Sequence, residues 1–213
     1  MNGIKFGNIH SFIDLNLILS SVNIPPAMPK MTYIDIPGAD GSLDLSEALG
    51  EIKYQNRNAT FTFTTLPEDD IMTKYSEVCN ALNGVHFNKI TLDKDSDWYW
   101  TGRCYVSSFT NNYPISKVVV TANLNPWKRK QDKTVVKKTL TSEYSDIILF
   151  NSRKKVSPTF IVDSEATIKF GSVETALSSG THVVLNFILS EGVNVLQAKG
   201  TGTIIIEYQE GDL

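Results

Sequence analysis

Short stretches in which apolar and polar side chains alternate run through most of this chain. In residues 59–65, Phe61 and Phe63 point to one side of a predicted strand and the threonines to the other. Val, Ile, Thr, Phe and Tyr are concentrated in such stretches, and turn residues separate them, which predicts a mainly β fold. The predicted strands are 32–36, 52–54, 59–65, 89–92, 99–109, 116–124, 137–141, 157–163, 166–170, 180–189, 192–198 and 202–208.

One segment has the period of a helix instead. The helix is predicted at about 67–83, with Pro67 at its start and Asn83-Gly84 at its end. Three acidic residues at 68–70 occupy the first turn, where the positive end of the helix dipole favours them. The apolar positions follow the spacing of a face packed on a sheet: Ile71, Tyr75, Val78, Cys79 and Leu82.

A polar, charged stretch at 125–133 that contains Pro126 follows a strong predicted strand and is typical of a linker. It predicts two domains, 1–133 and 134–213. The first is a β-sandwich-like domain with the helix. Regular turn signals in the second indicate two packed sheets, a sandwich or a jelly roll.

Composition and charge exclude several classes of protein. The 213 residues are 41% hydrophobic and 20% charged, with a net charge of −3, which points neither to nucleic acid nor to an anionic membrane. No apolar run approaches the roughly 20 residues of a membrane helix. The run 13–19 is broken by Asp14 and Asn16 and lacks a cleavage site, so we expect no signal peptide and folding in a cytosol.

The titratable residues form no recognisable catalytic or metal-binding pattern. Cys79 and Cys104 do not have CxxC spacing and are predicted to be two buried free thiols. The three histidines are far apart in the sequence, and no nucleophile motif accompanies them. Asp93-Lys-Asp-Ser-Asp97 begins like a calcium loop, but Trp98 and Cys104 occupy the positions that require Gly and Glu. We therefore predict no enzyme activity, no cofactor and no metal, and a hairpin turn at 93–97.

Two further features allow a binding interpretation. Trp98, Trp100 and Trp127 would stack on sugar rings if they were exposed on a sheet face, although core packing is the commoner role of tryptophan. Six Lys and Arg residues between 128 and 138 form a basic cluster, for which a solvated linker or a rim contact is favoured over nucleic-acid binding. No nucleic-acid-binding motif accompanies the cluster.

Several of these segments together resemble a known family. They are the turn Ile36-Pro-Gly-Ala-Asp-Gly-Ser-Leu-Asp44, the segment Tyr54-Gln-Asn-Arg57 before the aromatic strand 59–64, Trp100-Thr-Gly-Arg103, and the ending Tyr208–Leu213. In this combination the chain resembles the distal tail (Dit) proteins of long-tailed, non-contractile phages (siphophages). The residues Leu43–Leu49 are longer and more apolar than a bare turn, and they are a candidate for a short helix or an interface strip.

The resemblance implies a structural protein of the virion tail tip, or baseplate, assembled in the host cytoplasm from a phage or prophage gene. The first domain would form a hexameric ring between the major tail tube protein and the tail-associated lysin or fibre protein, near the tape measure protein. DNA would pass through the ring without specific binding. The second domain would be a galectin-like sandwich that carries the receptor-binding protein, and no membrane is involved.

An interface between protomers is expected at the turn and the segment that follows it, with Asp40, Gly41, Asp44, Tyr54, Asn56 and Arg57. Arg57 is the strongest candidate for a charge-assisted bond across the boundary, with an intramolecular pair to Asp35 or Asp44 as the equal alternative. If Arg57 bonds across the protomer boundary, Arg57→Ala leaves the monomer folded and weakens the ring. The alternative function is a carbohydrate-binding sandwich that recognises cell-wall or host glycans through the three tryptophans, although the block 134–213 contains none of them.

Overall fold

The computed structural model describes residues 2–48, 50–65, 70–111 and 115–213. Contacts divide the chain into two compact units, Met1–Lys128 and Arg129–Leu213. The predicted fold class is confirmed, because the described residues are mainly strands, with one α-helix and a single 3-10 turn. None of the helices in these ranges is long and apolar enough to cross a membrane.

The first unit is built on an antiparallel sheet with the strand order β2-β1-β7-β8-β9-β6-β3. The alternation predicted for the strand at 59–65 is confirmed, since Phe61 and Phe63 are fully buried and Thr60, Thr62 and Thr64 lie on the other face. Phe6 packs against both rings at centroid distances of 6.0 and 6.4 Å. The strands are β1 (Ile4–Phe6), β2 (Ile9–His10), β3 (Leu17–Asn23), β6 (Arg57–Thr65), β7 (His86–Leu92), β8 (Trp98–Thr110) and β9 (Lys117–Leu124).

The helix α1 (Ile71–Leu82) packs its predicted face onto this core, and Val78 and Leu82 are completely buried. Asp70 is the N-cap, accepting a hydrogen bond from the backbone N–H of Thr73 at 3.0 Å. Asn83 ends the helix, and Gly84 follows with φ at +77°. Residues 67–69 of the predicted helix lie outside the described residues.

The second unit is a sandwich of two four-stranded antiparallel sheets, which share one core around Phe160 and Phe187. One sheet has the order β11-β18-β13-β16, and the other the order β12-β17-β14-β15. The strands are β11 (Thr134–Thr139), β12 (Ser145–Asn151), β13 (Thr159–Val162), β14 (Ala166–Phe170), β15 (Val173–Leu177), β16 (Gly180–Val183), β17 (Gly192–Gly200) and β18 (Thr203–Tyr208). Two short strands, β10 (Lys128–Lys130) and β19 (Gly211–Asp212), pair with each other.

Several strands differ from their predicted positions. The sequence pattern missed β1, β2, β3, β10, β12, β15, β19 and β5 (Ser42–Asp44). The predicted strand 180–189 ends at Val183, and the predicted strand 52–54 is reduced to an isolated bridge between Tyr54 and Pro29. In β12 the apolar run Ile147–Phe150 hides the alternation, because Ile148 and Phe150 are exposed although they are apolar. The turn predicted at 93–97 is present as the 3-10 turn η1 (Asp93–Asp95) between β7 and β8.

Both cysteines are free thiols, as predicted, but only Cys104 is buried. Burial in the sheet raises the pKa of the Cys104 thiol to about 12. Cys79 on α1 is half-buried, because it lies at the margin of the packed helix face. The prediction of two buried thiols is therefore wrong for Cys79.

Candidate assembly surfaces

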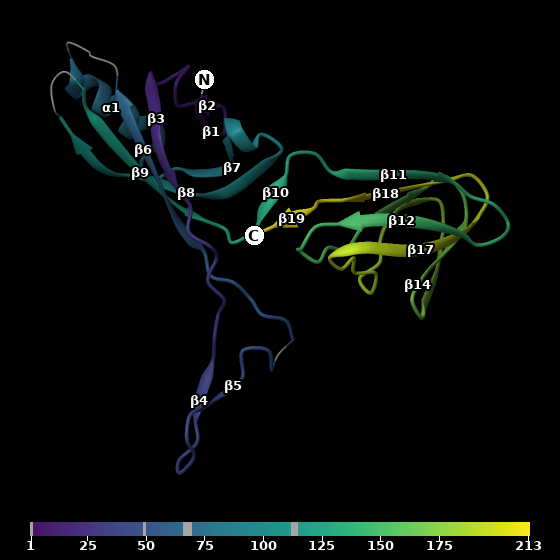
Figure 1. Ribbon diagram of the computed structural model, residues 1–213. Coiled ribbons are helices and arrows are strands. Elements are labelled where there is room, and N and C mark those ends of the chain that lie inside the picture. Colours follow the sequence, from purple (N-terminus) through teal and green to yellow (C-terminus); the bar gives the residue numbers. More distant parts are fainter. Residues whose placement is uncertain (1, 49, 66–69, 112–114) are drawn as a thin grey trace. The chain divides into compact units, whose positions relative to one another are not determined.

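Residues 24–56 form an extended arm, which leaves the sheet after β3 and returns to it at β6. Its backbone runs out and back as a narrow ladder: the N–H of Lys30 donates to the carbonyl of Lys53 at 2.7 Å, and that of Gln55 to the carbonyl of Met28 at 2.8 Å. The ladder ends in the hairpin of β4 (Tyr33–Asp35) and β5 (Ser42–Asp44), which among the described strands pair with each other alone (Figure 1). Between Leu19 and Arg57 no described residue is buried.

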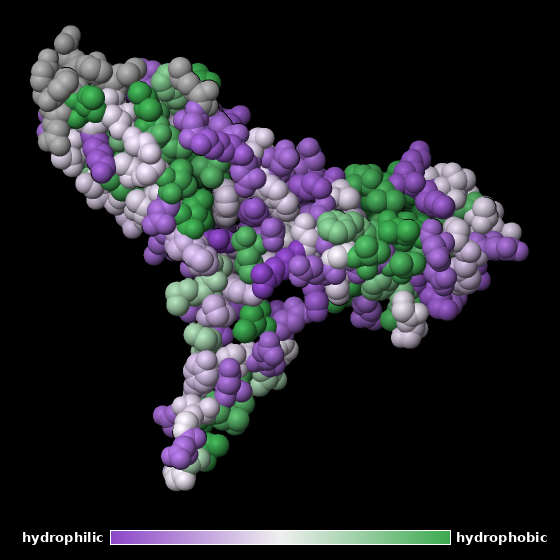
Figure 2. All heavy atoms as spheres, in the orientation of Figure 1, coloured by the Kyte–Doolittle hydropathy of each residue, from purple (hydrophilic) through white to green (hydrophobic). Residues whose placement is uncertain are grey.

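The hairpin has two unlike faces. Ile34 lies opposite Leu43 on one face, and Ile36 follows at the same side-chain parity. On the other face Asp35 lies opposite Ser42, whose hydroxyl donates to its carboxylate at 2.5 Å. Six large apolar residues of the arm are between 49% and 61% exposed: Met28, Met31, Tyr33, Ile34, Ile36 and Leu43. Figure 2 shows that apolar side chains lie at the surface of the arm. Apolar side chains without a core to fill are typical of a surface that is covered by a partner.

The base of the arm is fixed to the sheet by Arg57. Its guanidinium donates to the carbonyl of Pro25 at 3.4 Å and to the carbonyl of Pro126, and the side chain is only 7% exposed. Tyr54 packs edge-on against Trp127 with ring centroids 5.4 Å apart. These contacts join the two ends of the arm to the segment after β9.

The predicted interface residues all lie on the arm or at its base. Asp40, Gly41 and Asp44 are exposed at the hairpin, where Gly41 has φ at +75°. The hydroxyl and the backbone N–H of Ser46 donate to Asp44 and lower the pKa of its carboxyl. Asn56 donates to the side chain of Asn123 at 2.8 Å. The guanidinium of Arg57 donates to the backbone carbonyls of Pro25 and Pro126, and neither Asp35 nor Asp44 accepts these two hydrogen bonds.

Sequence reasoning did not select the apolar face of the hairpin. Ile34 and Ile36 lie in the predicted strand 32–36, and Leu43 begins the apolar segment 43–49, a candidate for a short helix or an interface strip. The available signal was an apolar strand pair on both sides of a turn, Pro37–Gly41, with four acidic residues and no basic residue in 33–47. Only the absence of a packing layer identifies this pair as a surface.

The three tryptophans lie in different surroundings and do not form one stacking platform. Trp100 is buried in the core of the first unit. Trp98 is partly covered by Lys128, whose Nζ lies 5.0 Å from the ring centroid. Trp127 packs against Tyr54 at the base of the arm.

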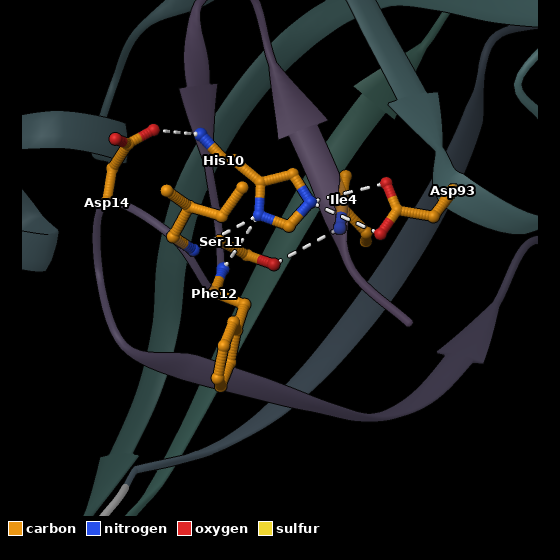
Figure 3. A network of polar contacts seen from close by, with 7 residues as sticks. Ile4, His10, Ser11, Phe12, Asp14 and Asp93 are labelled. Atoms are coloured by element: carbon orange, nitrogen blue, oxygen red, sulfur yellow. Dashed lines mark hydrogen bonds and ion pairs between the residues drawn. The ribbon is translucent and has the colours of Figure 1, made fainter. Parts of the chain in front are cut away.

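A network of polar contacts around His10 joins the N-terminal hairpin to the end of β7 (Figure 3). The Nδ1 of His10 accepts the backbone N–H groups of Phe12 and Ile13, both at 3.2 Å. The ring proton therefore lies on Nε2, which faces the carboxylate of Asp93 at 3.2 Å. Both ring nitrogens are thus engaged within the chain, and the His10–Asp93 contact ties the N-terminal hairpin to the turn after β7.

A second carboxylate of the Asp93–Asp97 motif also has a partner within the first unit. Asp95 pairs with Lys128 at 3.7 Å. Among the described residues no three His, Cys, Asp or Glu side chains lie close enough together to hold a metal ion.

A second exposed apolar surface lies on the second unit, on the outer face of β12 and β17. Ile148 pairs with Val195 and Phe150 with Val193 across the ladder, so the four side chains are direct neighbours. They are between 47% and 67% exposed. We call these four residues the β12–β17 patch, and an isolated sheet face of this kind is also typical of a contact surface.

The chain end is tied to the second unit through Glu210, which is 4% exposed. Its carboxylate accepts hydrogen bonds from Lys130 and Ser152, both at 2.7 Å, and from Thr134 at 2.5 Å. Burial alone would raise the pKa of Glu210, but these hydrogen bonds and the charge of Lys130 outweigh it, so the pKa lies below its ordinary value. Two of the six basic residues at 128–138 are thus in ion pairs of this unit, because Lys133 also pairs with Glu207 at 3.2 Å.

Comparison with known proteins gives an informative likeness. No family model and no curated protein matches the chain. The chain is similar to the crystal structure of the Dit (gp 19.1) protein of phage SPP1, with a TM-score of 0.72 and 14% sequence identity over 100% of both chains. That protein is described as a paradigm of the hub adsorption apparatus in phages that infect Gram-positive bacteria. The chain therefore has the Dit fold, and the resemblance predicted from the sequence is confirmed at the level of the fold.

Proposed function

We propose that this chain is a structural hub protein of a phage tail tip, which assembles into a ring through its arm. The full-length likeness to the SPP1 Dit protein supports the tail-tip location. The arm supports assembly, because its described residues include no buried one and it carries six half-exposed apolar side chains. Burial of these side chains against a neighbour supplies the free energy that the arm lacks in the monomer.

A ring forms if the arm of one protomer docks on a different surface of the next protomer. An arm that docks on a different surface of the next protomer makes a head-to-tail contact, and such contacts close into rings when the rotation allows. We expect six protomers, placed between the tail tube protein and the tail-tip proteins, with DNA passing through the centre. Asp40, Gly41 and Asp44 then lie at the interface, whereas Tyr54, Asn56 and Arg57 hold the base of the arm in place.

The second unit is the proposed mount for the receptor-binding apparatus, as a galectin-like sandwich. The β12–β17 patch supports this role, because it offers an apolar contact surface on a unit whose core is already complete. The proposal assigns no enzyme activity to the chain. It places the protein in the virion, as a structural component.

The test is the mass of the particle in solution, measured by light scattering after size exclusion up to millimolar subunit concentration, with negative-stain images. We expect six-fold rings from the unmodified protein. The triple variant Ile34→Ser, Ile36→Ser, Leu43→Ser is expected to need at least tenfold more protein to assemble, because it removes the apolar face of the hairpin. The control is the double variant Ile13→Ser, Met72→Ser, which removes apolar side chains outside the arm that are more exposed than those of the triple variant.

Two results would count against the proposal. An unmodified protein that stays monomeric throughout this concentration range excludes self-assembly into a ring. Equal assembly of the triple variant and the control excludes the arm as the contact.

A further inference from the structure

The first unit contains a groove of about 300 Å³ beside β3. On one side it is lined by residues 19–22 of β3, and on the other by Asn2, Leu92 and Lys94. Leu19 and Leu92 are largely covered and form its apolar floor, while Val22 is 39% exposed on its wall. The groove therefore offers a ligand both apolar side chains and the backbone of a strand.

This backbone belongs to an edge strand. β3 is the last strand of its sheet, and residues 18–23 pair with β6 alone among the described residues. At the start of the strand the edge is closed, because the N–H of Leu17 donates to the carbonyl of Ser11 at 2.8 Å. Beyond that point the edge faces the groove. An edge strand next to an apolar groove is suited to accept one extended chain by strand addition.

Strand β4 of the arm has the matching chemistry. Its outer edge is unpaired by any described strand, and Ile34 and Ile36 lie on the same face at the spacing that a strand presents to a groove floor. The surrounding hairpin carries Asp35, Asp40, Asp44 and Glu47 and no basic residue in 33–47. Among the residues that line the groove, Lys94 is the one with a charge. The neighbouring carboxylate of Asp93 is not part of the lining, because it faces His10. The charges of the hairpin and of the groove are thus complementary.

The amount of apolar surface on the arm also fits a contact between copies. Its six half-exposed apolar side chains present on the order of 600 Å², compared with the ~800 Å² that each partner contributes to a standard interface. We propose that the groove beside β3 accepts strand β4 of a second copy of this chain, with Ile34 and Ile36 against its floor. This inference rests on the proposed ring and names the surface of the neighbour that receives the arm.

Disulfide trapping tests the contact directly in the full chain. Val22→Cys is combined in turn with Ile34→Cys and with Ile36→Cys, because a disulfide requires Cα atoms within about 7 Å of each other. At least one pair is expected to give covalent dimers and higher species under oxidation, on a gel without reductant. The single variants control for Cys79 and Cys104, and Val22→Cys with Val193→Cys controls for random collision, because Val193 is also well exposed.

A charge placed in the groove gives a second measurement. Val22→Asp puts a carboxylate opposite the acidic hairpin and is expected to raise the concentration needed for assembly at least tenfold. Ile13→Asp, at an exposed apolar site outside the groove lining, is expected to leave assembly unchanged. Circular dichroism and a thermal melt establish that both variants are folded.

The outcomes separate this inference from the proposed function. If the unmodified protein forms rings, but neither cysteine pair is trapped beyond its controls and Val22→Asp assembles normally, the groove is not the acceptor and the ring proposal stands. If the unmodified protein never assembles, both proposals fail. Trapping of either pair, together with weakened assembly of Val22→Asp, establishes the groove as the acceptor.

Discussion

The side chains of Ile34 and Leu43 face each other across the β4–β5 ladder, and both remain about half exposed. In a sheet that packs on a core, a pair of this kind would be covered by a second layer. Here the ladder has three residue pairs and no second layer among the described residues. A two-stranded ladder of this length is marginal in water, so the pair supports an arm that is completed by a partner.

Arg57 is expected to be a stability residue of the monomer. Arg57→Ala removes the donors to the carbonyls of Pro25 and Pro126, and we expect a loss of about 1–3 kcal/mol in the free energy of unfolding, measured with urea. We also expect faster proteolysis near residues 24–30, where the arm leaves the sheet. The control is Arg103→Ala, which removes an exposed arginine that donates to the carbonyl of Gly84. If Arg57→Ala is as stable as the unmodified protein, Arg57 does not hold the monomer together, and a role at the protomer boundary is favoured instead.

The β12–β17 patch is expected to contribute little to the stability of the second unit. Phe150→Ser should change the free energy of unfolding by less than about 0.5 kcal/mol, because the side chain is exposed. The neighbouring Leu149→Ser should cost ~3 kcal/mol or more, because Leu149 is 1% exposed in the core. Chemical denaturation of the two variants measures both values. A large loss for Phe150→Ser would mean that the patch packs within the folded chain.

Glu210 is expected to make stability depend on pH in the acid range. Because its pKa is lower in the folded chain than the ordinary 4.5, its contribution is complete above that pH and is lost as the pH falls through the folded value. Glu210→Gln should therefore be less stable than the unmodified protein at pH 7, and the difference should shrink steadily below pH 4.5. Denaturation at a series of pH values measures this difference. A difference that does not change with pH would show that the carboxylate charge has no role.

The two thiols are expected to react very differently. With the pKa of Cys104 at about 12 and its side chain fully buried, the native protein should show one reactive thiol, that of the half-buried Cys79. Two thiols should react after denaturation. A chromogenic disulfide reagent counts them, and the variant Cys79→Ser identifies the reactive one. Rapid reaction of Cys104 in the native state would indicate that the first sheet opens locally.

The sequence predicted those elements in which side-chain chemistry and burial agree. Ala166–Phe170 and the core of β6 were located by their alternation, and the face of α1 by its spacing, because most of the side chains that they bury are apolar. β12 was missed for the opposite reason, since Ile148 and Phe150 are apolar and exposed. The pattern of a strand is readable only where the outer face is polar.

For the candidate surface, the sequence by itself selected two segments: the turn at Pro37–Gly41, which lies in the arm, and Tyr54–Arg57, which lies at its base. The tertiary structure decided which of these residues face outward. Arg57 became an internal anchor, while Ile34, Ile36 and Leu43 became the exposed face. The physical reason is that turn geometry and alternation are local properties of the chain, whereas burial depends on which distant segments pack beside a residue. A sequence pattern cannot indicate that a layer is absent, and here the absence of a layer over the described arm residues marks the surface.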